Sequence, residues 1–522
     1  MSVNSQTVRI PRRQWLQGAM AALLCLSNVT AFAAPPQTDR TLKVIAPWEV
    51  AGLEPSKSGF VFARLQIAET LVEVDDRGQL VGGLARSWAA SPDGLEWRFT
   101  LRPGARFHDQ SPVTPEAVAA SLQRALAQPG LLRNAGVRQI QAAADAVVLR
   151  LDKPFSTLPA FLSHASTLVL APAAYAADGS VRQLIGSGPY QVSALRPPQS
   201  LQTRRFDGYD GARPAIAAVD YLAVGRAETR GMMASSGQAD LVYTHDPVRY
   251  ASLQQARGLK LHLQPIPRTL YLKVNAGHKL MSDLRVRQAM SLAIDRPAIA
   301  QSLLRAPQAA ATQLFAPILA EWHVPTLSPL TQDLPRARAL LREAGWQPGA
   351  DGLLRNAQGQ PFKVTLRTFS DRPELPPMAS AIQAQFKAVG IDLAVSITNS
   401  GEIPAGHQDG TLELALLARN HGLVPDPLGS LIQDFGPRGG DWGAMGWHSA
   451  QVSQSIDTMS RAVDPRRRSA LRGAIATVLQ AELPVIPVAW SVHSMTASER
   501  LTGVSVDPLE RSYRISRMGW AR

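Results

Sequence analysis

The sequence predicts a mixed α/β fold built from more than one lobe. Segments with strand-like and helix-like patterns alternate along the chain, as expected where helices cover a sheet. No self-similar period is present, which argues against a repeat architecture. The chain has 522 residues, and the roughly 490 that follow the N-terminal segment are too many for a single hydrophobic core.

Residues 1–33 have the layout of an export signal. Arg9, Arg12 and Arg13 precede an apolar stretch over residues 18–26, and Ala31-Phe32-Ala33 forms a small-residue cleavage site. The apolar stretch is shorter than the roughly 20 residues needed to span a bilayer. We therefore expect cleavage after Ala33 and a mature protein in the periplasm.

The export route is left open by the sequence around the paired arginines. Pro11-Arg12-Arg13-Gln14-Trp15-Leu16-Gln17 is similar to a twin-arginine signal but departs from it at several positions, so an ordinary secretory signal fits as well. The single cysteine, Cys25, lies in this segment and follows Leu24, which is too large for a lipoprotein signal. The mature chain then has no thiol for disulfides, metal ligation or nucleophilic catalysis.

The charge of the chain favours anionic partners without indicating nucleic acid. The formal net charge is +13, and most basic residues stand singly. Nucleic-acid binders instead mass their positive charge on one face. The run Arg466-Arg467-Arg468 is more typical of a solvated helix that begins near Asp464.

The first half of the chain predicts two strands and a capped helix. Thr41–Ala46 and Trp97–Leu101 have strand composition, and a Pro-Gly turn ends the second. A helix is predicted from Thr114, which is a favourable N-cap, through Leu126, because Pro115 suits the first turn.

The second half predicts a βαβ rhythm with helices on a sheet. One helix is expected to begin at Asp283, and three more are expected over residues 295–304, 335–344 and 379–389. Strands are expected over residues 362–368, 391–397 and 412–417. Residues 307–329 are rich in proline and alanine and predict a long irregular connection.

Local motifs then occur in a specific order over nearly the whole mature chain. They are Glu69-Thr70-Leu71-Val72, Leu84-Ala85-Arg86-Ser87-Trp88, Ser91-Pro92-Asp93-Gly94, Phe107-His108-Asp109, Gly186-Ser187-Gly188-Pro189-Tyr190, Val286-Arg287-Gln288-Ala289, Ala293-Ile294-Asp295-Arg296 and Leu340-Leu341-Arg342-Glu343-Ala344-Gly345-Trp346. In this order the motifs resemble the peptide and nickel family of extracellular solute-binding proteins, family 5, which serves ABC importers.

The resemblance implies the two-lobed periplasmic binding protein fold, with an extra subdomain in the first lobe. We expect the first lobe over residues 34–270 with the subdomain at about 90–185, the second lobe over 271–490, and a return of 491–522 to the first lobe. It also implies a small-molecule solute and an ABC permease of the inner membrane as partners. We expect a monomer that needs no cofactor.

The resemblance places the solute between the lobes, against residues 60–64 and 419–446. Ala418-Arg419-Asn420-His421-Gly422 agrees with this on physical grounds, because a polar cluster follows the apolar segment 412–417. Arg419 matches an arginine of the nickel-binding branch, and a guanidinium can hold a carboxylate with two hydrogen bonds. The alternative is that Arg419 pairs with an internal carboxylate such as Asp426.

Two departures from the family's patterns bear on the solute. Leu423 stands where peptide binders carry an aspartate, so the usual clamp for a peptide amino terminus is absent. Leu168 stands where the nickel branch has an arginine, and Arg64 or Arg133 is a candidate for the missing charge.

Further candidate solute contacts are Asn420, His421, Trp442, Trp447 and Tyr243. Ordinary burial is the alternative for the two tryptophans. His421, His407 and His448 could each complete the coordination of a metal, and His421 is the candidate metal ligand at the predicted site. The alternative for all three is that backbone or water satisfies them, as is more common for single histidines in loops.

The sequence thus predicts a binding protein that captures a small anionic solute, such as a nickel chelate, by lobe closure. An oligopeptide- or dipeptide-binding protein is the alternative. A secreted hydrolase is disfavoured, because neither His-Glu-x-x-His nor Gly-x-Ser-x-Gly occurs. A role in signalling to a membrane receptor uses the same closure and is not separable from transport by sequence.

Overall fold

The structure, a computed structural model, describes residues 40–521 except 77, 129–130, 438 and 463. The predicted signal peptide over residues 1–33, including its arginines and Cys25, lies outside this range. The described residues form one compact unit. Among the described residues, no helix is long and apolar enough to cross a membrane.

A ten-stranded sheet runs through the whole unit. Antiparallel pairs join its two halves in the centre, and parallel pairs occur on both sides of that centre. In spatial order the strands are β16 (Asp392–Thr398), β15 (Lys363–Phe369), β17 (Leu414–Asn420), β12 (Leu259–Val274), β18 (Val485–Ser498), β11 (Leu241–Tyr243), β1 (Thr41–Ala46), β10 (Ala218–Ala223), β9 (Ser200–Arg205) and β8 (Tyr190–Arg196).

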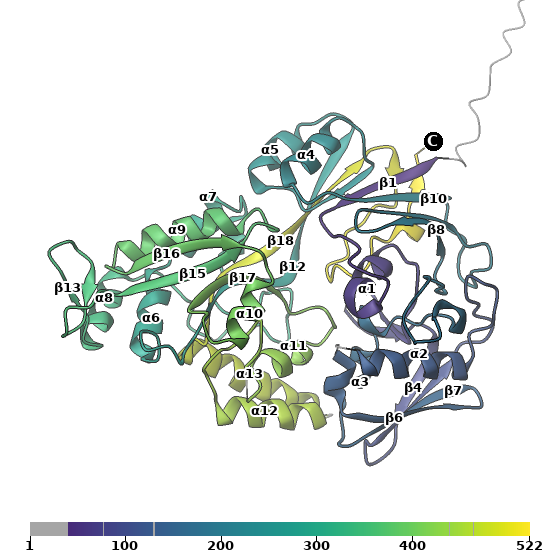
Figure 1. Cartoon of the computed structure of the whole chain (residues 1–522), viewed down its shortest axis with the longest axis horizontal. Helices are drawn as coiled ribbons and strands as arrows, with labels where there is room; N and C mark the ends of the chain where they lie inside the picture. The colour runs from purple at the N-terminus through teal and green to yellow at the C-terminus, as the bar shows by residue number, and fades with distance from the viewer. Residues whose placement is uncertain (1–39, 77, 129–130, 438, 463, 522) are drawn as a thin grey trace, which may run out of the picture. The chain divides into compact units, whose positions relative to one another are not determined.

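The long strands β12 and β18 connect two separate hydrophobic cores. The second-lobe core takes Leu270 to Val274 of β12 and Val485 to Ala489 of β18, whereas Met495 and Ala497 of β18 belong to the first-lobe core. The β12–β18 register shifts between Pro265 and Thr269. The two lobes are therefore joined by crossing strands (Figure 1). Their ladder is irregular near the crossing.

The first lobe carries a second, four-stranded antiparallel sheet. Helix α2 (Pro115–Ala127) packs on this sheet, and Thr114 Oγ1 accepts a hydrogen bond from Ala117 N at 3.3 Å, as its predicted N-cap role requires. The strands, in order, are β4 (Ala85–Ala90), β5 (Glu96–Leu101), β7 (Ala146–Leu151) and β6 (Val137–Ala143).

Helices cover the sheets of both lobes (Figure 1). Those of the first lobe are α1 (Pro55–Arg64), α3 (Leu158–Phe161), α4 (Ala227–Ser235) and α5 (Tyr250–Gln254), beside α2. Those of the second lobe are α6 (Leu284–Ala293), α7 (Arg296–Ser302), α8 (Leu334–Glu343), α9 (Leu375–Lys387), α10 (Glu402–Gln408), α11 (Leu428–Asp434), α12 (Ala450–Arg461) and α13 (Pro465–Glu482). Short ribbons pair β2 (Val72–Val74) with β3 (Leu80–Gly82), β13 (Gln347–Pro348) with β14 (Leu354–Arg355), and β19 (Leu501–Thr502) with β20 (Gly519–Trp520).

Most predicted elements are confirmed, and two boundaries are wrong in ways that matter. Helix α9 begins at Leu375 instead of residue 379, because its two prolines occupy the first turn, where their missing N–H groups cost nothing. Strand β17 extends to Asn420, because Arg268, Thr269 and Leu270 of β12 pair with Asn420, Arg419 and Ala418. Arg419 and Asn420 therefore lie on a strand and not in a loop.

The expected lobe boundaries fall inside the crossing strands. Residues 270 and 271 lie in β12, and residues 490 and 491 lie in β18. Away from these strands the lobes also meet at Ser156, whose N–H donates to Ser460 O at 2.8 Å. This contact joins the segment before α3 to the end of α12, where Figure 1 draws the two helices next to one another.

Candidate functional site

A cavity of about 360 Å³ lies where the two lobes and the C-terminal segment meet. Its walls come from the end of α1, from residues 66–76 and 163–168 of the first lobe, from Asn420 and Leu423 of the second lobe, and from residues 507–517. Its volume falls within the ~300–1,000 Å³ typical of small-molecule sites. This cavity is the candidate solute site.

Arg64 is a cationic group of the cavity that has donor capacity to spare, as is Arg511, whose buried Nε also has no hydrogen-bond partner among the described residues. Arg64 is the last residue of α1, and only 8% of its surface is exposed. Its guanidinium stacks on the ring of Trp48 at 3.8 Å, and its Nε donates to the carbonyl of Glu510 at 2.9 Å. Its buried Nη1 has no hydrogen-bond partner among the described residues. A guanidinium held in this way is prepared to bind an anionic group.

Asn420 reaches the cavity from the other lobe. Its Nδ2 donates to Glu510 Oε2 at 3.0 Å, and its Oδ1 accepts from Gly422 N at 2.7 Å. Leu423, the residue found in place of the peptide-clamp aspartate, also lines the cavity, as does Leu168 of the first lobe. The cavity therefore brings together four positions that sequence reasoning singled out.

Acidic side chains also face the cavity, and arginines pair with most of them. Glu73 Oε2 lies 3.7 Å from Arg511 Nη1, and Asp76 Oδ1 lies 2.6 Å from Arg514 Nη2. Glu69 accepts two hydrogen bonds from Arg102 Nη2. Burial raises the pKa of Glu69 to about 7, even though Arg102 favours its charged form. The cavity is thus mixed in charge instead of uniformly basic.

Arg419 is held by an internal carboxylate, although not the one that the sequence suggested. Its Nε donates to Asp434 Oδ2 at 2.6 Å and its Nη2 to Asp434 Oδ1 at 3.0 Å. Gln433 Oε1 takes a further bond from Nη2. Asp426, the expected partner, pairs with Arg468 of α13 instead. Arg419 does not line the cavity. Its charge acts on the cavity residue His164, whose pKa is lowered to about 4 mainly by burial and to a smaller extent by Arg419.

His421 points into an apolar environment. Its ring meets Phe315 edge to face at 5.3 Å, and neither ring nitrogen has a hydrogen-bond partner among the described residues. The described residues also contain no group of three or more His, Cys, Asp and Glu side chains that could hold a metal ion. A metal role for His421 therefore requires a solute that brings the other ligands with it.

The other two histidine candidates lie elsewhere. His407 Nδ1 is 3.1 Å from Lys273 Nζ, which also donates to the carbonyls of Gly440 and Gly443. His448 is exposed after Trp447. Neither histidine lines the cavity.

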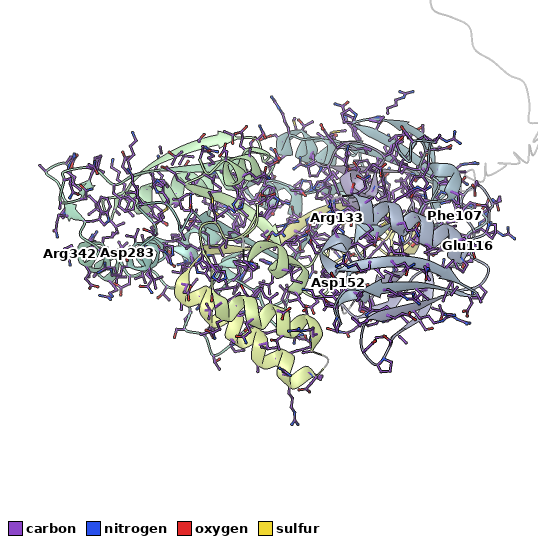
Figure 2. The ribbon with its side chains drawn as sticks, turned by 60° about the horizontal axis from the view of Figure 1, so that its bottom comes forward. Phe107, Glu116, Arg133, Asp152, Asp283 and Arg342 are labelled. Atoms are coloured by element: carbon purple, nitrogen blue, oxygen red, sulfur yellow. The ribbon has the colours of Figure 1, made fainter. Side chains whose placement is uncertain are left out.

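Arg133, Trp442, Trp447 and Tyr243 do not line the cavity either. Arg133 is exposed in a short 3₁₀ turn of the first lobe. Figure 2 shows it in the same lobe as Glu116 and Asp152.

The three aromatic candidates are engaged in packing inside the lobes. Trp447 Nε1 donates to Glu482 Oε2 at 2.7 Å, and Trp442 packs against Phe369. Tyr243 stacks on Tyr513 with ring centroids 4.3 Å apart. The ring of Trp447 lies in the second-lobe core and that of Tyr243 in the first-lobe core, whereas Trp442 is partly buried and packs against the second-lobe core.

The C-terminal segment contributes cavity residues that sequence reasoning missed. Asp507, Glu510, Arg511 and Arg514 all line the cavity. A signal was present, because residues 507–517 are densely charged and follow a largely apolar strand. The family resemblance implied a return of residues 491–522 to the first lobe, but no local pattern in the sequence places the segment at the end of α1.

Comparison with known proteins identifies the family. The family model described as "Bacterial extracellular solute-binding proteins, family 5 Middle" matches residues 79–442, which is more than half of the chain. The chain belongs to this family of solute-binding proteins. The two-lobed fold predicted from sequence and the function class of solute binding are thereby confirmed.

One relative in the family matches nearly the whole chain. The chain is 25% identical to the nickel-binding periplasmic protein of Escherichia coli K12 over 508 residues, which covers 94% of this chain and 95% of the relative.

Solved structures show the same fold. NikA from Brucella suis in complex with Fe(III)-EDTA has a TM-score of 0.83 at 23% identity and covers 92% of this chain and 100% of its own. The oligopeptide-binding protein AppA from Bacillus subtilis, in complex with a nonapeptide, has a TM-score of 0.80 at 18% identity and covers 92% and 99%.

Proposed function

We propose that this family member is the periplasmic solute-binding component of an ABC importer. It is exported by the signal over residues 1–33, acts as a monomer without catalytic activity, and captures a small anionic solute by lobe closure. It then delivers the solute to the permease of the inner membrane. A metal chelate, in which carboxylates surround the metal, is the solute class that the site suits best.

The observation that carries this proposal is the environment of Arg64. A buried guanidinium stacked on Trp48, with an unpaired Nη1 beside a cavity of about 360 Å³, is costly unless an anion completes it. A chelate supplies carboxylates for Arg64, and it carries its own metal ligands, which the described part of the chain lacks as a cluster. The likeness to the nickel-binding relative and to the Fe(III)-EDTA complex supports the same class.

A second candidate solute is a short peptide, and a separate observation favours it. The carboxylates of Glu69, Glu73, Asp76 and Asp507 line the same cavity. A peptide amino terminus would find a counter-charge there, although Leu423 replaces the usual aspartate. The peptide carboxylate would then bind Arg64.

Thermal unfolding of the mature protein against defined solutes tests the proposal. The solutes are nickel(II) alone, nickel(II) with L-histidine, Fe(III)-EDTA, metal-free EDTA, and a set of di- to hexapeptides. A solute at 100 times its dissociation constant stabilises by about 2.7 kcal/mol, so even modest binders give a measurable shift. We expect a shift with the chelates and none with nickel(II) alone.

The other outcomes are equally informative. A shift with peptides alone would contradict the proposal of a chelate and support a short peptide as the solute. A shift with nickel(II) alone would contradict the Arg64 anion site, because a bare cation gives a guanidinium nothing to bind.

A further inference from the structure

Glu510 makes contacts to four residues from different parts of the fold. Its Oε2 accepts hydrogen bonds from Arg268 Nη2 at 2.5 Å and from Asn420 Nδ2 at 3.0 Å. Its Oε1 lies 3.4 Å from His493 Nδ1. Its backbone carbonyl accepts the bond from Arg64 Nε at 2.9 Å. One residue thus engages both polar cavity residues, Arg64 and Asn420.

The four partners belong to both lobes and to both crossing strands. Arg64 ends α1 in the first lobe, Asn420 ends β17 in the second, and His493 lies on β18. Arg268 faces Asn420 across the β12–β17 pair and lies in the stretch of β12 where the register with β18 shifts. Any change in the angle between the lobes must therefore alter the surroundings of Glu510.

The backbone at Glu510 is in a conformation that only its surroundings can hold. Glu510 has a φ of 57°, in the left-handed region that favours glycine. Its side chain is only 2% exposed. A buried charged residue in a strained backbone conformation persists only where its surroundings hold it in place.

The charge balance around Glu510 agrees with the geometry. Burial alone would raise the pKa of the Glu510 carboxyl, but the arginines at 268, 64 and 372, together with His493, lower it to about 2. Glu510 is therefore charged at every physiological pH. Removing its charge leaves Arg268 buried without its carboxylate.

We propose that Glu510 is a positioning residue that couples lobe closure to the solute site. Its carbonyl fixes the guanidinium of Arg64 on one lobe, and its carboxylate receives Asn420 of the other lobe when the lobes meet. The role in solute affinity rests on the proposed function of the cavity, but the role in closure does not.

Moving the carboxylate from position 510 to position 420, in two steps, tests the proposal. Asn420→Asp keeps the Oδ1 that accepts from Gly422 but places a carboxylate against that of Glu510. We expect it to lower the closed fraction of the solute-free protein at least fivefold. Adding Glu510→Gln restores a donor opposite Asp and leaves one carboxylate for Arg268, so the double variant should return to within about twofold of the wild-type closed fraction.

The closed fraction is measured from the distance between two spin labels. Gln141 of the first lobe and Ser469 of α13 are exposed and can each be replaced by cysteine. The only natural cysteine, Cys25, lies within the predicted signal peptide, so the mature chain offers no competing thiol. Pulsed electron spin resonance then gives the distance distribution without any solute.

A matched control separates positioning from mere stability of the C-terminal segment. Asp240 is buried in the first lobe and does not line the cavity; its carboxylate accepts hydrogen bonds from Lys43 N at 3.0 Å and from Arg500 Nη2 of the C-terminal segment at 2.9 Å. Asp240→Asn should lower the melting temperature and leave the closed fraction unchanged. If Asp240→Asn opens the lobes as much as Asn420→Asp does, Glu510 is only structural.

Other results would also overturn the coupling. A double variant that is more open than either single variant, or an Asn420→Asp protein with the wild-type distance distribution, contradicts it. Calorimetry with nickel(II)–histidine is run in parallel. If the distances change as expected but wild-type protein does not bind this chelate, the proposed solute fails while the coupling stands.

Discussion

Arg419 and Arg64 are both candidate anion-binding residues by sequence, but they have different roles in the structure. Arg419 is matched by the carboxylate of Asp434, and both side chains are nearly inaccessible. Among the described residues, Arg64 has only carbonyl and aromatic partners, and its Nη1 beside the cavity has no hydrogen-bond partner. The difference lies in the neighbours and not in the residue type, so sequence alone ranked Arg419 first.

Arg419→Met tests the structural role of the ion pair with Asp434. Removing one partner of a buried ion pair typically costs about 3–5 kcal/mol, because the other charge is left buried. We expect a loss of this size in the free energy of urea unfolding at pH 7.5. Adding Asp434→Asn removes the stranded charge and should recover much of it. A single variant with wild-type stability would contradict the pairing.

The site residues show which information a sequence holds. Arg64, Leu168 and Leu423 were singled out by comparison with family patterns and Asn420 by its place after an apolar segment, and all four line the cavity. Glu510 was missed, because its importance depends on contacts with residues far from it in the sequence, including Asn420 and Arg64. No local pattern reports such contacts.

At the scale of elements, local chemistry explains where helices begin. Aspartates accept from the backbone at the starts of α6, α7, α8 and α13, as the N-cap preference predicts. Strand β17 was placed too short, because its last two residues are polar and look like a loop. The pairing with β12 decides its length, and pairing between distant strands is not visible in a local pattern.

Two glycine substitutions test the packing of elements. A Cβ at Gly188 would lie 2.2 Å from the carbonyl oxygen of Gln66, so Gly188→Ala must displace the backbone just after α1. Gly473 lies within α13 with no atom within 4 Å of its added Cβ. Gly473→Ala should stabilise the protein by about 0.5–1 kcal/mol, whereas Gly188→Ala should destabilise it.

Thermal unfolding of both alanine variants beside the wild type is the measurement. Equal melting temperatures for the two variants would show that the close approach at Gly188 is not a constraint.

At the scale of the whole molecule, buried histidines predict a loss of stability in mild acid. Burial, assisted by the charge of Arg419, lowers the pKa of His421 to about 3, and burial lowers that of His493 to about 4. Their pKa values in the unfolded chain are near 6.5, so the unfolded state binds protons that the folded state does not. The contribution of the two neutral histidines to the free energy of unfolding is complete above pH 6.5 and decreases as the pH falls toward 4.

His421→Phe isolates one of these contributions. Phenylalanine keeps a ring against Phe315 and cannot take up a proton. By linkage, His421 should account for about 2 kcal/mol of the stability lost between pH 7.5 and pH 5. Urea unfolding at both pH values should show a smaller loss for the variant by that amount. An unchanged difference between the two pH values would mean that His421 is not kept neutral by burial.

The two-lobed architecture itself was predicted through family motifs and not through periodicity. Alternating strands and helices indicate an α/β class, but they do not show that β12 and β18 pass from one core to the other. That arrangement places Arg64, Asn420 and Glu510 at one point between the lobes, and it makes the cavity a property of the whole chain.

Calorimetric titration of two arginine variants with Fe(III)-EDTA and nickel(II)–histidine tests the central claim most directly. Arg64→Gln removes the charge at the cavity, and Arg133→Gln removes an exposed charge of the same lobe. Loss of a charge-assisted hydrogen bond of about 1.5–3 kcal/mol should weaken binding by Arg64→Gln roughly tenfold to a hundredfold, while Arg133→Gln binds as the wild type does. Equal affinities of the two variants, or a loss confined to Arg133→Gln, would contradict the assignment of Arg64 as the anion-binding residue.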